Sequence, residues 1–335
     1  MIFNRLIFVA VTIVTIGFAS TACAEMEYNA ALPSEAGFHT YTEGLRHEAL
    51  KRGISAATVN QVFDHLIFMP RSVDQDRKQP EKKLTFDDYR QRIVSPTRIK
   101  KGREMYDRYY HLLQQVSARY GVAPQYIVAL WGTETNYGGY TGNFNIPSAL
   151  ATLAYEGRRE DFFKKEFFDA LKIIDDGHID HAHMTGSWAG AMGQNQFMPS
   201  SFHNFAVDFN GDGRRDIWGT TIDVFASTAN YLSKSGWRGD EKWGREVRVP
   251  ANFNPALMGR DIKKPLREWA AMGVRTIDGR PIPVVDGLMA SVVAPDGPGG
   301  VTFLTYNNYD VFMKWNRSLY FATSVGLLAD SIVNR

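Results

Sequence analysis

The stretch Ala129–Gly142, which reads ALWGTETNYGGYTG, places a single carboxylate at the end of an apolar segment. Upstream of it, Pro124 suits the first turn of a helix. On such a helix Ile127, Leu130 and Glu134 share one face, because they are spaced by three and four residues. The glycines that follow favour the end of the helix close behind the carboxylate. The sequence therefore predicts an apolar helix with Glu134 on its apolar face, in the last turn.

Glu134 would lie where an ionised carboxylate is unfavourable. A helix C-terminus carries partial negative charge and partial burial removes solvation, so both effects raise the pKa of the carboxyl group. A carboxyl group that is protonated near neutral pH can act as a general acid. A frayed, solvated helix end without chemistry explains this stretch equally well, so other motifs must decide. Downstream, Tyr137 and Tyr140 flank two glycines, a composition that suits the floor of a groove where sugar rings stack.

The first 24 residues have the layout of a secretory signal peptide. Arg5 precedes an apolar run over residues 6–19, which is too short for a confident membrane span, and small residues follow. We predict cleavage after Ala24 and a mature chain of residues 25–335. The alternative is a lipoprotein in which Cys23 is acylated and associates with the outer membrane. We favour cleavage, because Ser20 stands where a lipoprotein signal prefers an aliphatic residue.

Composition narrows the class of protein. The chain carries 38 basic and 36 acidic residues, and its net charge of +2 gives no reason to expect nucleic acid as a partner. Cys23 is the only cysteine, so an intramolecular disulfide is impossible and stability must come from a large apolar core. With 44% hydrophobic residues, the mature chain can supply one or two compact domains. We expect an exported monomer.

Hydrophobic spacing in the N-terminal third predicts helices. Residues 38–53 and 55–66 have helical spacing, and Ser55 suits an N-cap. Residues 69–84 are charged and contain proline, which favours an extended segment at the surface. Residues 97–121 form one long amphipathic pattern that ends at a glycine.

Beyond residue 243 the pattern changes from helical to β-rich. Short β-branched pieces alternate there with Gly, Pro and Asp turns, and a final apolar segment is again helical. The predicted fold class is mainly α, with a small β-rich insertion. The predicted organisation of the single catalytic region is an α lobe (36–123), a core (124–243), the β-rich segment (245–305) and a closing helix (316–333).

A second motif, GSWAGAMGQNQFMPSSF at residues 186–202, combines small residues with neutral amides. The small residues around Trp188 allow close backbone approach. Gln194, Asn195 and Gln196 offer both donors and acceptors, which suit sugar hydroxyl and acetamido groups. Taken alone, a Gly/Ala-rich helix that packs against its neighbours is the simpler interpretation.

A third motif at residues 208–219 resembles the first half of an EF-hand loop. Oxygen ligands at alternate positions and a glycine at the sixth position are supplied by Asp208, Asn210, Asp212 and Gly213. The twelfth position, usually a bidentate glutamate, is Gly219. The backbone carbonyl of Arg214, with Asp216 or Asp223, would complete the shell of a structural calcium ion. The alternative is an Asx-rich turn without metal.

Taken together, the motifs resemble one known family. ALWGTETNYG, GSWAGAMGQNQFMPSSF, DFNGDGRRDIW and STANYLSKSGW, in this order, look like the lytic murein transglycosylase B family, glycoside hydrolase family 103. Its members include membrane-bound enzymes and the soluble Slt35 form, and the similarity runs over residues 38–333. The resemblance implies a lysozyme-like α core, a periplasmic location and cleavage of the MurNAc–GlcNAc bond of peptidoglycan glycan strands.

The resemblance also implies roles for particular residues. Glu134 matches the single catalytic acid/base, and the Asp208 loop matches an EF-hand-like site. The positions that match sugar-binding residues are Ser187, Gln196, Tyr231 and, in the segment KWNRSLYFA, Asn316. Two departures are visible, because Trp315 and Phe321 stand where tyrosine is common.

The expected reaction needs no cofactor. Glycosidases normally use two carboxylates, yet near Glu134 the sequence offers only amides and aromatic residues. A lytic transglycosylase requires only one carboxylate, because the C6 hydroxyl of MurNAc attacks in place of water. The product then has a 1,6-anhydro end. Two alternatives stay open. One is a lysozyme-like hydrolase with a second carboxylate from Glu156 or Asp180, and the other is an inactive scaffold that binds peptidoglycan or calcium.

Overall fold

The computed structural model describes residues 34–77 and 84–334, so the predicted signal peptide and Cys23 lie outside the described residues. The chain forms two compact units. The first comprises residues 34–77 and 140–223, and the second comprises residues 84–139 and 224–334. Within the described ranges, no helix combines the length and the apolar character needed to cross a membrane.

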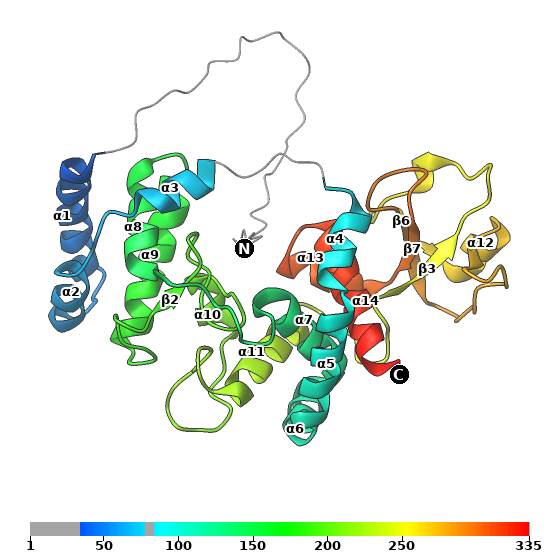
Figure 1. Ribbon diagram of the computed structural model, residues 1–335, viewed down its shortest axis with the longest axis horizontal. Coiled ribbons are helices and arrows are strands. Elements are labelled where there is room, and N and C mark those ends of the chain that lie inside the picture. Colours follow the sequence, from blue (N-terminus) through cyan, green and yellow to red (C-terminus); the bar gives the residue numbers. More distant parts are fainter. Residues whose placement is uncertain (1–33, 78–83, 335) are drawn as a thin grey trace, which may run out of the picture. The chain divides into compact units, whose positions relative to one another are not determined.

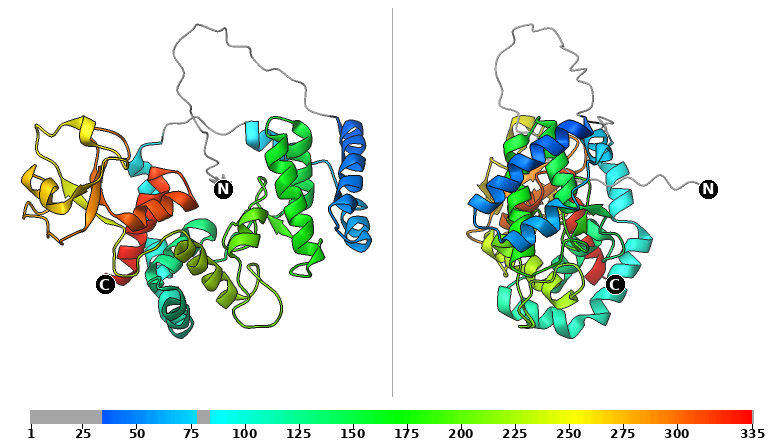
Figure 2. Two further views of the ribbon diagram at one scale, coloured as in Figure 1. Left: turned by 180° about the vertical axis from the view of Figure 1, so that it is seen from behind. Right: turned by 90° about the vertical axis from the view of Figure 1, so that its left-hand side faces the viewer.

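The first unit is built around a pair of packed helices, α8 (Ile146–Glu156) and α9 (Glu160–Asp175), which lie side by side in Figure 1 and Figure 2. Further elements complete the unit: α1 (Glu35–Lys51), α2 (Ala56–Phe63), α3 (Pro70–Arg77), β1 (Phe144–Asn145), β2 (Thr185–Gly186) and α10 (Pro199–Phe205). Helices α1 and α3 pack on α8, whereas α2 and α10 pack on α9. As predicted, Ser55 caps α2 by accepting a hydrogen bond from the backbone N–H of Thr58.

Two segments of the chain differ from the sequence prediction. Residues 70–77 form helix α3, not an extended segment, because Pro70 starts a helix that buries Val73 and pairs Asp76 with Arg158 and Arg159. The single long helix predicted over residues 97–121 is two helices, α5 (Pro96–Arg108) and α6 (Tyr110–Tyr120). The break is at Tyr109, whose backbone leaves the helical region (φ −105°, ψ 17°).

The helices of the second unit gather around α14 (Leu319–Val333). It packs against α4 (Phe86–Ile93), α5, α7 (Pro124–Thr135) and α13 (Asn307–Trp315). Helix α11 (Thr221–Lys234) starts in the first unit and contributes most of its length to the second. Helix α14 begins at Leu319, three residues later than predicted, because the Ser318 side chain accepts the N–H of Phe321 as an N-cap.

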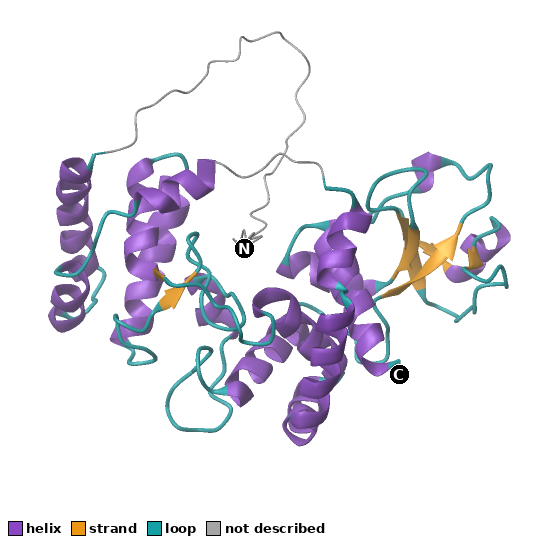
Figure 3. Ribbon diagram, viewed as in Figure 1, coloured by secondary structure: helices purple, strands orange, loops and turns teal. Residues whose placement is uncertain are grey.

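A small antiparallel sheet fills the β-rich part of the second unit (Figure 3). Its strand order is β4-β6-β7-β3-β5, formed by β3 (Gly244–Arg248), β4 (Lys264–Pro265), β5 (Arg275–Thr276), β6 (Met289–Val293) and β7 (Thr302–Thr305). A 3-10 turn (Pro255–Leu257) and helix α12 (Leu266–Ala271) connect the strands. The sheet and helix α12 bury their own apolar cluster, which includes Trp269, Val247, Val292 and Leu304. The predicted mainly α fold with a β-rich segment is confirmed.

Candidate active site

Helix α7 carries Glu134 in its last turn, as the sequence predicts. The helix is buried on nearly all sides, and Pro124 occupies its first turn. Its end is unusual, because Asn136 and Tyr137 both have left-handed backbones (φ 51° and 61°). Non-glycine residues rarely adopt this conformation, and such strain is often concentrated at functional sites. It lets the N–H groups of Asn136 and Tyr137 satisfy the carbonyl groups of the last helical turn.

Tyr137 is buried behind this helix end and is only 6% exposed. Its hydroxyl donates to the carbonyl of Arg98 (2.8 Å), and its ring lies edge-on to Trp131. The ring also lies directly over the Cα of Gly132, since a Cβ built there would come within 2.5 Å of it. A ring enclosed in this way packs against the helix end and exposes little surface, and the stacking role of Tyr137 stays a prediction.

The carboxyl group of Glu134 is half-buried and has one notable partner. The indole N–H of Trp315, the last residue of α13, donates to Oε1 of Glu134 over 2.6 Å. Burial raises the pKa of Glu134 to about 7, and the hydrogen bond from Trp315 partly opposes this rise by stabilising the ionised form. No carboxylate of the described residues contributes to the shift. Glu134 can therefore hold or release a proton near neutral pH.

The surroundings of Glu134 are otherwise neutral or aromatic. Tyr89 on α4 has a hydroxyl whose pKa is raised above its usual range by burial and, to a lesser degree, by the charge of Glu134. The ring of Tyr231 on α11 lies against Trp315 with centroids 4.6 Å apart, and burial raises the pKa of its hydroxyl to about 12. Both phenols stay protonated across the pH range in which Glu134 titrates.

Two of the predicted sugar-binding residues lie in the second unit with Glu134. The Tyr231 hydroxyl donates to the carbonyl of Lys314 over 2.7 Å. Asn316 follows α13, and its side-chain oxygen accepts the backbone N–H of Ser318 (3.0 Å). Phe321, the second departure from the family pattern, is buried in the core of the unit. The structure thus brings Tyr231, Trp315 and Glu134 together.

The other two predicted sugar-binding residues, Ser187 and Gln196, lie in the first unit. Ser187 is buried, and its Oγ accepts the N–H of Ala191 (3.0 Å), which leaves the hydroxyl hydrogen to donate. Gln196 has a left-handed backbone (φ 52°), and its amide nitrogen donates to the carbonyl groups of Thr141 and Gly193. Its side-chain carbonyl faces no donor among the described residues and can accept one from a ligand.

The acidic loop of the first unit is held together by its own hydrogen bonds. Asp208 accepts backbone N–H groups of residues 211–213, and Asp212 accepts that of Arg214. Asp223 is fully buried and accepts the N–H groups of Phe209 and Asp216. Among the described residues, no three His, Cys, Asp or Glu side chains converge on one point. The predicted carboxylate ligands Asp208, Asp212 and Asp223 therefore do not converge on one point. The oxygen donors suit calcium in type, and the amide of Asn210 and backbone carbonyls would have to supply the remaining ligands.

The two alternative carboxylates have other partners. Glu156 is almost fully buried and pairs with Arg77 (3.1 Å). Asp180 is exposed, and the side chain and backbone N–H of His183 hold its pKa below the usual range. Each is thus engaged by a neighbour within the first unit.

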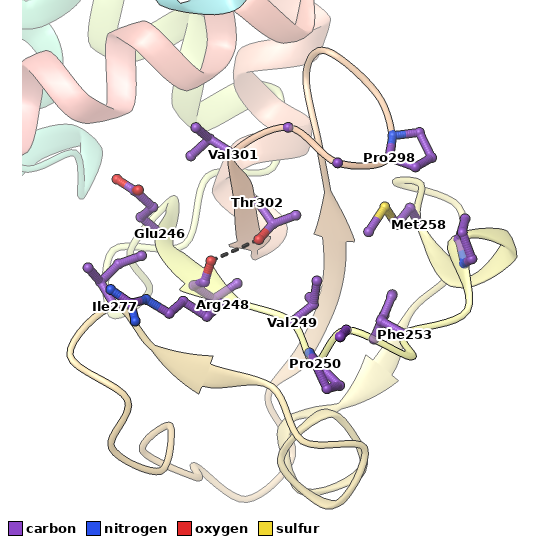
Figure 4. Close-up of a pocket in the computed structure, with 15 residues that line it drawn as sticks. Glu246, Arg248, Val249, Pro250, Phe253, Met258, Ile277, Pro298, Val301 and Thr302 are labelled. Carbon is purple, nitrogen blue, oxygen red and sulfur yellow. Dashed lines mark hydrogen bonds between the residues drawn. The ribbon is translucent and has the colours of Figure 1, made fainter.

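A pocket of about 620 Å³ lies in the β-rich part of the second unit (Figure 4). Strand β3 and the turn after it supply most of its wall, with apolar side chains such as Val249, Phe253 and Met258. Glu246 and Arg248 lie along one side of it. Glu134 is not among the lining residues. Glu134 is the better candidate for the active site, because burial raises the pKa of its carboxyl group to about 7.

The hydrogen bond between Trp315 and Glu134 was missed by sequence reasoning. The two residues are separated by 181 positions, and Trp315 was noted only as a departure from a tyrosine. The involvement of Tyr89 was also missed. A single sequence holds no signal for such contacts, since neither spacing nor composition links α4, α7 and α13.

Comparison with known proteins finds a family that matches most of this chain. The family described as "Transglycosylase SLT domain" matches residues 37–330. Membrane-bound lytic murein transglycosylase B of Escherichia coli K12 is 33% identical over 249 residues, which is 73% of this chain and 66% of that protein. The chain thus spans slightly less than two thirds of this relative.

Solved structures are similar over most of the chain. SltB3 of Pseudomonas aeruginosa, in complex with NAG-NAM-pentapeptide, is 43% identical, covers 89% of this chain and 80% of its own, and gives a TM-score of 0.86. Slt35 of Escherichia coli, in complex with calcium, is 26% identical, covers 92% and 98%, and gives a TM-score of 0.74. The predicted resemblance and the lysozyme-like α fold are confirmed.

Proposed function

The chain belongs to the Transglycosylase SLT family, and from this we propose that it is a lytic transglycosylase that cleaves the MurNAc–GlcNAc β-1,4 bond of peptidoglycan. Glu134 is the single general acid/base in this proposal. The observation that carries it is a half-buried carboxyl group with a pKa of about 7, whose hydrogen-bond partner Trp315 is neutral and cannot take its proton.

The reaction uses Glu134 twice. The protonated carboxyl group first donates its proton to the glycosidic oxygen of the leaving GlcNAc, while the bond from that oxygen to C1 of MurNAc breaks. The carboxylate then takes the proton of the MurNAc C6 hydroxyl, whose oxygen bonds to C1. The product is a 1,6-anhydro end, and Glu134 is protonated again. A pKa near 7 suits both steps, because neither state is strongly favoured.

A single carboxylate is sufficient for this chemistry. Retaining and inverting glycosidases need a second one, about 5–5.5 Å or about 6.5–9.5 Å from the acid. No carboxylate of the described residues perturbs Glu134, whereas carboxylates within those distances would raise its pKa further. The alternatives are a muramidase with a distant second carboxylate and an inactive scaffold. A scaffold has no use for a carboxyl group with a raised pKa.

We assign sugar binding to the Ser187 hydroxyl, the Gln196 side-chain carbonyl, Tyr231 and Asn316. SltB3, the relative solved with NAG-NAM-pentapeptide, supports a glycan carrying a stem peptide as the substrate. We propose that residues 25–335 act as one periplasmic catalytic region after removal of the leader.

The first prediction concerns the reaction product. Purified residues 25–335 are expected to release anhydromuropeptides from sacculi without an added cofactor, because the attacking hydroxyl belongs to the substrate. Mass spectrometry after borohydride reduction checks this. Reduced hydrolysis products would be heavier by one water and one hydrogen molecule. Their predominance would show a muramidase, and no release of either product would support the scaffold.

The second prediction concerns calcium at the loop of Asp208, Asn210 and Asp212. The Slt35 relative was solved with calcium, so we propose a structural ion that takes no part in the chemistry. An ion that binds only the folded state adds about 2.7 kcal/mol at a hundred times its Kd. Calorimetry should show a Tm that rises with calcium, and D208N/D212N should remove the rise. A calcium-independent Tm in the wild type would refute the metal site.

A further inference from the structure

The contact between Trp315 and Glu134 is asymmetric, because an indole N–H can only donate a hydrogen bond. The bond ends on Oε1 of Glu134, which must therefore act as acceptor. When Glu134 is protonated, its carbonyl oxygen is a better acceptor than its hydroxyl oxygen, although both have lone pairs. The indole N–H therefore favours the form with the C=O on Oε1 and the hydrogen on Oε2.

We propose that Trp315 is a positioning residue that fixes the transferable proton of Glu134 on Oε2 and so presents one defined oxygen to the glycosidic bond. This proposal rests on the proposed function, since it specifies which oxygen acts as acid. It adds a requirement to the proposed function: a partner that can only donate must bind Oε1, the oxygen that does not carry the proton.

The indole is held in place from several sides. The Tyr231 ring lies against it at an interplanar angle of 62°, and the Tyr231 hydroxyl bonds the carbonyl of Lys314, the residue before it. The ammonium group of Lys314 in turn donates to the carbonyl of Ser235 (2.7 Å). The end of α13 is thus held by hydrogen bonds to Tyr231 on α11 and to Ser235, the residue that follows α11. A rotation of the indole away from Glu134 would disrupt the packing against Tyr231.

The phenols beside Glu134 and beside its partner Trp315 do not offer a competing proton acceptor near pH 7. Tyr89 on α4 and Tyr231 on α11 both have hydroxyl pKa values raised by burial, so both stay neutral. The proton on Glu134 therefore depends on the carboxyl group itself and on Trp315.

Infrared spectroscopy of the protein without substrate tests this proposal directly. A neutral carboxyl group whose C=O oxygen accepts a hydrogen bond absorbs at a lower frequency than one whose C=O is free. The Glu134 band is identified as the one that is lost in Glu134→Gln. In the wild type we expect the lower frequency, and in Trp315→Phe a shift to higher frequency. The apparent pKa of the band should rise by about one unit in this variant, because a donor to the ionised form is lost.

Kinetics provide the second measurement. Trp315→Phe should lower kcat about tenfold with little change in KM, and it should move the pH profile upward with the pKa of Glu134. Trp315→Tyr, which restores a donor, should recover part of both effects. The matched control is Trp243→Phe, which removes an indole–carboxylate bond of the same type, to Asp330 (3.0 Å). It should lower Tm and leave the Glu134 band unchanged.

The outcomes separate this proposal from the proposed function. A Trp315→Phe protein that keeps the wild-type carbonyl frequency and pKa would overturn the proton assignment, whatever its activity. If that variant does not fold, a wild-type band at the frequency of a free C=O overturns it equally. A wild type that shows the expected band but yields no anhydromuropeptides would refute the function and leave the hydrogen-bond assignment standing.

Discussion

Glu134→Gln is expected to keep the fold and lose activity on sacculi by at least 10²–10⁴-fold, the range typical of general acid–base catalysis. Glutamine has nearly the same shape, and its side-chain oxygen can still accept the indole hydrogen of Trp315. It cannot donate a proton to the glycosidic oxygen or accept one from the C6 hydroxyl. Both steps of the proposed reaction fail together, and a change of pH should not restore activity, because the amide does not titrate. The measurement is the rate of anhydromuropeptide release.

Glu156→Gln and Asp180→Asn are the matched controls for this substitution. Both replace a carboxylate by its amide in the first unit, where Glu156 pairs with Arg77 and Asp180 with His183. Each should keep activity close to that of the wild type once a loss of stability is taken into account. If Glu134→Gln kept a tenth of the activity while one of these variants lost it, the acid would have been assigned to the wrong residue.

Glu134→Gln should stabilise the protein although it abolishes activity, and the size of the stabilisation depends on pH. The pKa of Glu134 is raised from 4.5 to about 7 in the folded protein. Between these values the folded state binds more protons than the unfolded state, so the wild-type free energy of unfolding falls as pH rises. The fall is on the order of 3 kcal/mol over this window as an upper value. Glu134→Gln should therefore match the wild type near pH 4 and have a higher Tm above pH 7.

Much of the candidate site could be predicted because it depends on local spacing. Glu134 lies on the apolar face and in the last turn of α7, since Pro124 and the glycines define the two ends of the helix. The raised pKa follows from that position and its burial. The β-rich segment was equally visible, since β-branched runs between glycine and proline turns are a local pattern.

The remaining features depend on contacts that a single sequence does not encode. Trp315 reaches Glu134 only because α13 and α7 are both packed in the second unit around α14. Tyr137 looks like an exposed platform in sequence, yet its hydroxyl reaches the carbonyl of Arg98 on α5 and draws the ring inward. Its left-handed backbone is equally invisible, because most non-glycine residues avoid that conformation.

Gly132→Ala is expected to destabilise the protein by about 1–3 kcal/mol, although helix propensity alone predicts a gain of about 1 kcal/mol. A Cβ at this position would come within 2.5 Å of the Tyr137 ring. The ring cannot easily withdraw, because its hydroxyl is bound to Arg98 and lies 2.6 Å from where a Cβ of Gly102 would be. The strain should displace residues 135–137 and with them Glu134, so activity should also fall. Denaturant unfolding measures the first effect.

Gly44→Ala is the matched control, because Gly44 lies inside helix α1 and a Cβ there has nothing within 4 Å. It should raise the free energy of unfolding by about 0.5–1 kcal/mol. The cause of the Gly132 effect can be isolated by combining Gly132→Ala with Tyr137→Ala, which removes the ring. The double variant should then be more stable than the sum of the two single effects, because the clash is absent. Additive effects would mean that Tyr137 does not press on Gly132, and the helix end that orients Glu134 would need another explanation.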